Sequence, residues 1–489
     1  MKIAINRIAT LSFLSIIITL LIYFILKNAT FLVGDDSSFL TTTAIGKYYP
    51  ASTFVGWNGR FPPLMHWIFN VLLLFPGGKS ALAHFLVIAV GFFIFTLLQY
   101  LFFRKLIYSE SELPVYNDWL IIFCTVFISV RVYPVFLDLY MAENIAVVCI
   151  SLFLIFYFKF WQTSKVHYGI LALIPVIFVT YVKEPIFGSF LVLSMTVLIF
   201  SGNKLSKTYK IFHWSLVLNF LVFAVLYYLF VLRHSFSMYG EISQLTGTEL
   251  IYKVFRNHKV LFLAFLLTFY RLYCVIVKKD RQNLIYDALL FAGVSYSVAM
   301  LILKMSFAKY YLPALVFSFP AIIFWAVKTI NIRWVSLIML ISAMYCTNLI
   351  INDIKENQQA RSTTLPILNS ISELISEGYS LYWYQPELNI DFYDIREDKK
   401  SYLEIYLRYL IKERSEVKTI KISTFKDLPL NENCLVLNPN ENESNSHAKK
   451  EFEDFITQNK FKLFQIIQGV KIYKTQYLSL KSSDIQFNL

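Results

Sequence analysis

Two adjacent carboxylates, Asp35 and Asp36, follow the first apolar segment of this 489-residue chain. Acids are scarce before residue 352, where only twelve of 351 residues are Asp or Glu. Neighbouring carboxylates repel each other, so one keeps a proton or both share a cation. The pair therefore predicts a general base for an acceptor hydroxyl, and a divalent metal ion is the one cofactor left open. The alternative is a solvated pair that caps a short helix at Ser37-Ser38.

A second acidic site is expected around Asp138 and Glu143, which lie between two apolar segments. The two residues are five positions apart, so they need not share one helix face. We interpret Asp138 as a candidate catalytic acid and Glu143 as a candidate binding residue. An ordinary polar loop between two membrane spans is an equally good interpretation of this segment.

Basic residues lie close to the apolar segments on the same predicted side, namely Arg60, Lys183, Lys304 and Lys309. An arginine can fork onto phosphate oxygens and a lysine can act as a point charge, so the set predicts a clamp for a lipid phosphate. Simple anchoring to lipid headgroups is the alternative. Glu184 stands between Lys183 and Pro185, which indicates a constrained turn.

The composition is that of a membrane protein, with 57% hydrophobic residues, 18% aromatic residues and a mean hydropathy of +0.56. The first apolar run, residues 8–26, is too long for a cleaved signal peptide and is expected to remain as a span. Eleven spans are predicted, with ten or twelve left open. The other ten are residues 81–103, 118–133, 144–160, 168–182, 186–201, 211–232, 259–277, 284–303, 310–327 and 334–351.

The loop charges predict the orientation, because cytoplasmic loops carry an excess of Lys and Arg. With the N-terminus inside, the segment Val277 to Arg281 and similar basic loops face the cytoplasm, and seven of the twelve acids face outward. The five cysteines form no CxxC motif and no set that predicts a disulfide framework or a zinc cluster. No nucleic-acid signature is present.

The chain divides by composition into a transmembrane module, residues 1–351, and a polar part, residues 352–489. The module has a net charge of +15 and a long first exterior loop at residues 28–80, whereas the polar part has a net charge of −2. In the loop, the apolar stretch Met65 to Phe75 is too short to span a membrane and predicts an interfacial or re-entrant helix. The polar part predicts a small extracytoplasmic α/β domain. Its expected strands are residues 379–384, 416–422, 434–438, 462–468 and 470–473, and its expected helices are residues 365–377, 400–413 and 448–458.

These features together resemble the GT-C class of membrane glycosyltransferases. The segment Lys309-Tyr310-Tyr311-Leu312-Pro313 looks like the Tyr-Tyr-x-x-Pro stretch that opens a late helix in several GT-C families, and residues 469–474 are similar to their final hairpin. Size and layout are most like bacterial O-antigen-modifying glucosyltransferases, which act in lipopolysaccharide assembly. The chain departs from many relatives in reading Asp-Asp-Ser-Ser-Phe where they read Asp-Glu-x-x-Tyr, so the exact family stays open.

The resemblance implies an inverting hexosyltransferase of the bacterial inner membrane with a periplasmic C-terminal domain. It would move a sugar such as glucose from undecaprenyl phosphate, or another polyprenyl phosphate, to a glycan or lipid-linked acceptor of the cell envelope. The family's base corresponds to Asp35 or Asp36, with Asp35 as the first choice and Asp36 then supporting it or sharing a metal ion. The second acid corresponds to Asp138, with Glu143 as the alternative. Arg60, Glu143, Lys183, Glu184, Lys309, Tyr310 and Tyr311 are the expected substrate-binding residues.

Two other functions stay open. An envelope polysaccharide polymerase or ligase is also polytopic, but it characteristically places Arg and His in its exterior loops. A lipid-linked sugar flippase or transporter predicts charged residues within the spans, and few are visible in the sequence.

Overall fold

The computed structural model describes most of the first 376 residues and short stretches after them. The described residues are 2–27, 29, 63–64, 67–72, 74–75, 77–78, 80–110, 114–137, 139, 142–201, 205–233, 246–305, 307–376, 379–384, 419–422, 434–438, 454, 456–458, 461–467 and 470–474.

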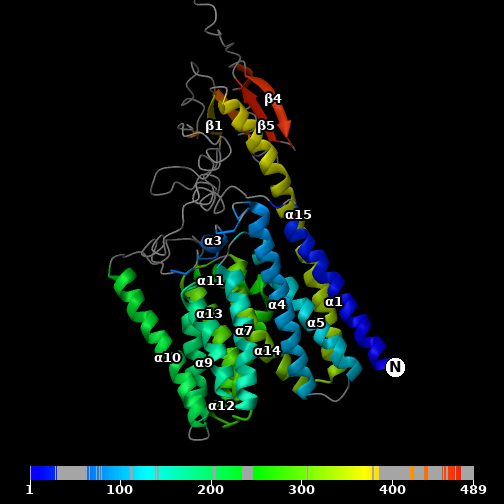
Figure 1. Ribbon diagram of the computed structural model, residues 1–489, viewed down its shortest axis with the longest axis vertical. Coiled ribbons are helices and arrows are strands. Elements are labelled where there is room, and N and C mark those ends of the chain that lie inside the picture. The colour runs from blue at the N-terminus through cyan, green and yellow to red at the C-terminus, as the bar shows by residue number, and fades with distance from the viewer. Residues whose placement is uncertain are drawn as a thin grey trace, which may run out of the picture. The chain divides into compact units, whose positions relative to one another are not determined.

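Helices that lie side by side form a bundle in the first part of the chain (Figure 1). In chain order they are α1 (Lys2–Leu26), α3 (Trp67–Leu72), α4 (Ala81–Glu110), α5 (Pro114–Val132), α6 (Pro134–Leu137), α7 (Ala142–Thr163), α8 (Val166–Thr180), α9 (Ile186–Ser201), α10 (Lys207–Tyr227), η3 (Tyr228–Leu232), α11 (Gly247–Asn257), α12 (Lys259–Ile276), α13 (Leu284–Ile302), η4 (Ala308–Tyr311), α14 (Leu312–Thr329) and α15 (Ile332–Ser376).

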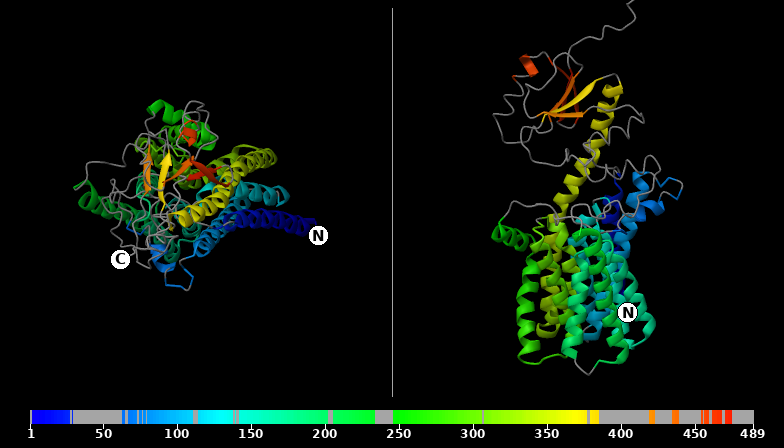
Figure 2. Two further views of the ribbon diagram at one scale, coloured as in Figure 1. Left: turned by 90° about the horizontal axis from the view of Figure 1, so that it is seen from above. Right: turned by 90° about the vertical axis from the view of Figure 1, so that its left-hand side faces the viewer.

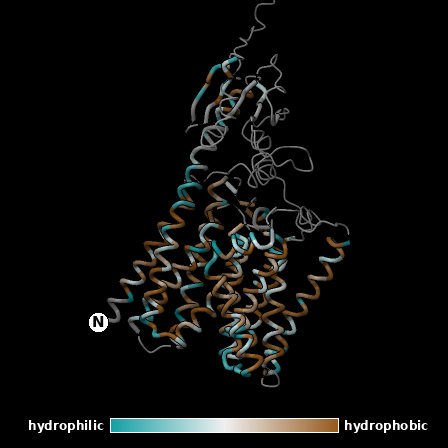
Figure 3. Tube along the Cα trace, turned by 180° about the vertical axis from the view of Figure 1, so that it is seen from behind, coloured by the Kyte–Doolittle hydropathy of each residue, from teal (hydrophilic) through white to brown (hydrophobic). Residues whose placement is uncertain are grey.

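Each of the eleven predicted spans falls on one of these helices, which confirms a multi-pass α-helical membrane protein. Eight described helices are long and apolar enough to cross a bilayer, and α8 and α9 are shorter apolar helices. The remaining predicted span falls on α5. Hydrophobic residues run along the helices of the bundle (Figure 3). The apolar stretch in the first loop contains a six-residue helix, α3.

The bundle has inner and outer helices. In α13 and α14, 72% of the most apolar 18-residue stretch of each helix is buried by protein, whereas the value is 22% for α1 and α10. Viewed from above, α1 lies at one edge of the bundle (Figure 2). The outer helices keep large apolar side chains exposed, as a lipid environment allows.

Glycine allows the two inner helices to approach closely. A Cβ added at Gly293 of α13 would lie 2.6 Å from the backbone oxygen of Ala314 in α14. Small residues at such a crossing let two transmembrane backbones touch. This contact fixes the start of α14, which carries part of the site described below.

Contacts between helices that are distant in sequence define two ends of the bundle. At the first, called the Glu143 end, α7 begins, α8 ends and α14 begins. There the Tyr133 hydroxyl donates to the Leu21 carbonyl oxygen at 2.7 Å, which joins the end of α5 to the end of α1.

The opposite end is called the Arg7 end, where α1 begins, α4 ends and α5 begins. Arg7 donates to the Tyr108 hydroxyl at 3.2 Å, which joins the start of α1 to the end of α4. Arg281 donates to the Phe200 carbonyl oxygen at 3.2 Å, which joins the α12–α13 loop to the end of α9. The two ends therefore gather different loops.

The helices up to Lys355 form one compact unit, and a second unit contains the strands. The strands are β1 (Ser380–Tyr384), β2 (Thr419–Ile422), β3 (Cys434–Asn438), β4 (Lys462–Ile467) and β5 (Val470–Lys474). Their order in the sheet is β2-β1-β3-β5-β4. β1 pairs parallel with β2 and β3, whereas β5 pairs antiparallel with β3 and β4.

All five predicted strands are present, within three residues at either end. The predicted helix at residues 365–377 falls within α15, and residues 454 and 456–458 are helical. The predicted helix at residues 400–413 lies outside the described residues.

Candidate functional site

A buried ion pair at the Glu143 end joins the start of α7 to the turn between α8 and α9. The Lys183 Nζ atom lies 2.5 Å from Glu143 Oε1, and each side chain is less than 5% exposed. Glu143 is in the first turn of α7, where a negative charge also faces the positive end of the helix dipole. Burial of two charges costs several kcal/mol each, so the pair is stable only because each partner neutralises the other.

A tight turn between α8 and α9 presents Lys183. The Lys183 N–H donates to Val179 O at 2.9 Å, and the Ile186 N–H donates back to Lys183 O at 3.2 Å. The backbone oxygen of Glu184 begins the next turn by accepting from the Phe187 N–H at 3.2 Å, and the Glu184 side chain is also buried. The sequence prediction of a constrained turn at this position is confirmed.

The described part of the first loop reaches the same turn. Leu64 follows Arg60 by four residues, and its N–H donates to Tyr181 O at 3.1 Å. Tyr181 is two residues before Lys183. The segment that follows Arg60 in the sequence therefore contacts the turn that carries Lys183.

The third element at this end is η4. Lys183 Nζ lies 4.7 Å from the ring centroid of Tyr310, close enough for an attractive contact between a cation and an aromatic face. Lys309 is half-buried beside it, and the positive charge of Lys309 acts on Glu143. Two lysines, one glutamate and a tyrosine thus gather here, from the start of α7, the α8–α9 turn and η4.

Local backbone geometry returns the chain to this place after α13. Lys304 adopts a left-handed conformation with φ 53°, which is uncommon for a residue with a side chain. Its N–H donates to Leu301 O at 3.0 Å, and the Met305 N–H donates to Met300 O at 3.0 Å. These two bonds form a Schellman motif, which ends α13 and turns the chain towards η4.

Tyr311, the last residue of η4, fixes this segment by a hydrogen bond to the preceding loop. Its side chain is fully buried, and its hydroxyl donates to Met305 O at 2.8 Å, within the same loop. This bond gives Tyr311 a part in fixing the loop. Its predicted contact with substrate stays a prediction.

A histidine that the sequence analysis did not single out fixes η4 from the other side. His258 Nε2 lies 2.9 Å from Ala308 O, and His258 Nδ1 lies 3.0 Å from Arg131 Nη2. A guanidinium only donates and a carbonyl only accepts, so the ring is neutral with its proton on Nε2. Burial, with the nearby Arg131 charge, lowers the pKa of His258 to about 3.

Among the predicted site residues, Glu143, Lys183, Glu184, Lys309, Tyr310 and Tyr311 lie at this one end. Asp35, Asp36, Arg60 and Asp138 lie outside the described residues. Within the part of the chain that the structure describes, no group of three or more His, Cys, Asp or Glu side chains could hold a metal ion.

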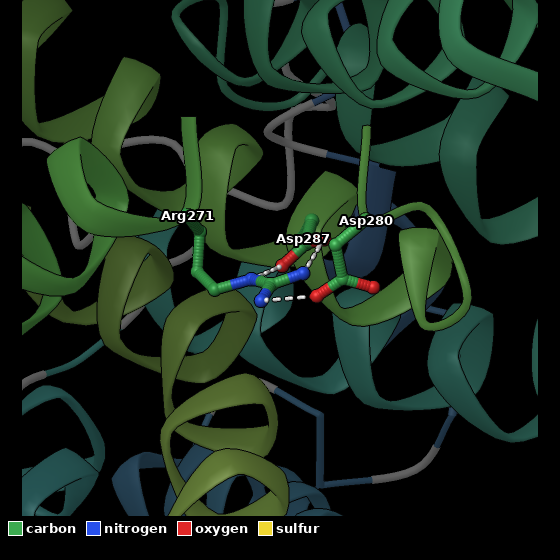
Figure 4. A network of polar contacts seen from close by, with 3 residues as sticks. All are labelled: Arg271, Asp280 and Asp287. Carbon is green, nitrogen blue, oxygen red and sulfur yellow. Dashed lines mark hydrogen bonds and ion pairs between the residues drawn. The ribbon is translucent and has the colours of Figure 1, made fainter. Parts of the chain in front are cut away.

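A second ionic cluster lies towards the Arg7 end, where the α12–α13 loop contacts the end of α9. Figure 4 shows its three residues, Arg271, Asp280 and Asp287. Arg271 Nε and Nη2 donate to the two carboxylate oxygens of Asp287 at 2.8 and 2.9 Å, and Nη1 donates to Asp280 at 3.0 Å. The guanidinium carbon lies 3.7 Å from the ring centroid of Trp325. The pairing with Arg271 lowers the pKa of Asp280, which lies in the loop outside the spans.

No protein-family model matches this chain, and neither does any curated protein. Two crystal structures of ArnT from Cupriavidus metallidurans are similar, one bound to undecaprenyl phosphate and one in the apo state. Each has a TM-score of 0.48 over 95% of this chain and 97% of the other, with 12% and 11% identity. A similarity of this size defines neither fold nor activity, so neither is inferred from it.

Proposed function

We propose that this protein is an integral membrane glycosyltransferase of the GT-C class. It transfers a hexose, such as glucose, from a polyprenyl-phosphate donor to a glycan or lipid-linked acceptor of the cell envelope. The observation that carries the proposal is the buried Lys183, held by Glu143 against Tyr310 where three loops of the bundle meet. Such a cation at the rim of a membrane bundle suits the phosphate of a lipid-linked sugar.

The chemistry is a single displacement at the anomeric carbon. The acceptor hydroxyl oxygen attacks that carbon, the bond to the phosphate oxygen breaks, and polyprenyl phosphate leaves with the electron pair. One displacement inverts the anomeric configuration. Because phosphate is a good leaving group, cations that stabilise its developing charge matter more than a general acid.

We assign the base to Asp35, which would take the hydroxyl proton. Asp35 follows α1 in the sequence, and α1 ends at the Glu143 end, where Leu21 is bonded to Tyr133. Asp36 would support Asp35 or share a divalent cation with it, and Asp138 would orient the acceptor. Lys183, Lys309 and Arg60 would hold the phosphate, and Glu143 would keep Lys183 in place.

The orientation belongs to the same proposal. The Arg7 end would face the cytoplasm of a bacterial inner membrane, and the Glu143 end and the strands would face the periplasm. Loop charge supports this assignment, because the Arg7 end carries most of the Lys and Arg of the short loops. A reporter fused to the C-terminus should be active only if it works outside the cytoplasm.

The test is an assay of sugar transfer. Membranes that contain the protein would receive labelled polyprenyl-phosphate hexoses and candidate envelope acceptors, and the label on the acceptor would be measured. The proposal predicts transfer that requires the lipid phosphate and fails with nucleotide sugars alone. If no lipid-linked sugar is consumed while acceptor chains are joined to one another, the protein is a polymerase or ligase instead.

Metal dependence is tested in the same assay. If Asp35 and Asp36 share a divalent cation, a chelator should abolish transfer, and Asp36→Asn should cost as much as Asp35→Asn. If Asp36 only tunes its neighbour, the chelator should have no effect and Asp36→Asn should be the milder variant.

A further inference from the structure

A cavity of about 250 Å³ lies between α1, α4 and α5 at the Arg7 end, on the opposite side of the bundle from Lys183. Arg7 and Arg104 line it with Asp118 and Tyr100, and the rest of its lining is mostly apolar. Two of the three helices are open to the surroundings beside it: Arg104 is exposed, and so is about half of the Arg7 side chain.

Polarity changes along the cavity in the same direction on all three helices. On α1, Arg7 comes first, and Leu11 lies one turn deeper beside Thr10, whose hydroxyl donates to the Arg7 carbonyl oxygen at 3.0 Å. On α5, Asp118 comes first and Ile121 and Ile122 lie one turn deeper. On α4, which runs the other way, Arg104 is nearest the end and Tyr100 lies one turn deeper. The cavity is therefore ionic at its mouth and apolar towards the middle of the membrane.

The ionic part of the cavity has an uncompensated positive charge. Arg7 Nε lies 3.6 Å from Asp118 Oδ2, and the Tyr108 hydroxyl donates to Asp118 Oδ1 at 2.5 Å. The carboxylate thus already has a cationic partner and a hydrogen bond. Within the described part of the chain, Arg104 has no ion-pair partner, so two arginines and one aspartate leave a net charge of +1.

An apolar path on the outside of the bundle continues from this mouth. Leu97 and Leu101 of α4 are 43% and 42% exposed, and with Arg104 they follow the spacing of one helix face. Leu11 of α1 is 43% exposed on the other side. A molecule whose anionic group enters the cavity could lay its hydrocarbon along these leucines.

We propose that this cavity binds the headgroup of an anionic glycerophospholipid from the surrounding membrane. The phosphate lies against Arg104 and Arg7, the Tyr100 ring packs beside the glycerol, and the acyl chains follow Leu11, Leu97 and Leu101. Basic pockets between transmembrane helices recognise anionic headgroups by this combination of charge and apolar surface. A free phosphate would use only the mouth of the cavity, so we assign the site to the whole lipid.

The test compares lipid binding to the purified full-length protein by native mass spectrometry. Phosphatidylglycerol and phosphatidylcholine of equal chain length would be titrated into the wild type and single variants. We expect the wild type to prefer phosphatidylglycerol. Arg104→Ala should lower the affinity for phosphatidylglycerol about fivefold, and Asp118→Asn should raise it, because the amide keeps the size of the carboxylate but removes its charge.

Two controls separate the cavity from general surface charge. Lys207→Ala removes an exposed lysine at the same end but outside the cavity, and should leave lipid selectivity unchanged. The double variant Glu143→Gln/Lys183→Met alters only the opposite end, and should also bind phosphatidylglycerol normally.

Equal losses in Arg104→Ala and Lys207→Ala would overturn the proposal in favour of unspecific attraction. Unchanged or weaker binding in Asp118→Asn would overturn it too. Displacement of the lipid by millimolar inorganic phosphate would show a small-anion site instead.

Discussion

Two ionic clusters in the described part of the bundle differ in how many carboxylates each cation contacts. Arg271 uses all three guanidinium nitrogens on two carboxylates and packs its face on Trp325. Among the described residues, Lys183 has one carboxylate partner and one aromatic neighbour. Two carboxylates already offset the Arg271 charge, so a further anion would meet a net negative cluster, and the cluster serves the fold. A lysine with three donors and a single carboxylate can still hold an anion.

The two clusters also lie on different kinds of structure, the first between two helices and the second in loops. Arg271 and Asp287 belong to α12 and α13, so the cluster fastens a helical hairpin across a short loop. Lys183 lies in a turn between α8 and α9, beside an irregular segment at η4. Binding residues are commonly carried by loops on a rigid scaffold. We therefore interpret the first cluster as architecture and the second as part of the active site.

The largest expected effect concerns the proposed base. Asp35→Asn should lower sugar transfer by about 10²–10⁴-fold while expression and membrane insertion stay intact, because an amide cannot accept the hydroxyl proton. The transfer assay measures it. If Asp35→Asn keeps most of the activity and Asp138→Asn does not, the base lies in the second loop.

The next effect should fall on stability alone. Arg271→Ala leaves Asp287 fully buried without its partner, and such a loss typically costs about 3–5 kcal/mol. Denaturant unfolding of the purified protein measures it, with Arg281→Ala, which removes an exposed arginine of the α12–α13 loop, as the control. An active Arg271→Ala protein of normal stability would show that the Arg271 cluster does not stabilise the fold.

Acid should weaken the Glu143 end through His258. Its folded pKa of about 3 lies below the unfolded value of about 6.5, so the unfolded chain takes up a proton first as the pH falls. Stability is then lost between about pH 6.5 and 3, by about 2 kcal/mol at pH 5 relative to pH 7. Glutamine keeps a donor and an acceptor but does not titrate. Between about pH 6.5 and 3, unfolding of His258→Gln should therefore take up about one proton fewer than unfolding of the wild type, and its unfolding free energy should fall less steeply with pH.

The smallest effect concerns Asp280, the partly exposed member of the Arg271 cluster. The Asp280 side chain is 39% exposed, and Arg271 keeps its two bonds to Asp287 without it. Asp280→Asn should cost less than about 1 kcal/mol. A loss in denaturant unfolding as large as that of Arg271→Ala would mean that all three residues act as one unit.

Hydropathy predicts the helices well, because each span needs about twenty apolar residues whatever its neighbours are. The alternation of spans also places Glu143, Lys183 and Lys309 on one side. The pairing of Lys183 with Glu143 could not be predicted, because it depends on how α7 and α8 are rotated about their own axes.

His258 and Arg271 were missed for related reasons. A single histidine next to a span gives no pattern, and Arg271 meets Asp287 sixteen residues later only when the α12–α13 hairpin closes. A transporter would carry charged residues within its spans, and Arg271 and Asp287 form one such buried pair. The pair is neutral, however, and both carboxylate oxygens of Asp287 accept from Arg271, as in a contact that joins two helices.

The most direct test of the comparison is donor binding by a protein without the Glu143–Lys183 pair. Glu143→Gln/Lys183→Met removes both charges at similar volume, so stability should change little, as such replacements are often neutral. Affinity for a polyprenyl phosphate, measured by ligand-induced thermal stabilisation, should fall by on the order of 1.5–3 kcal/mol. Unchanged affinity in a stable double variant would contradict the assignment of this pair to the active site.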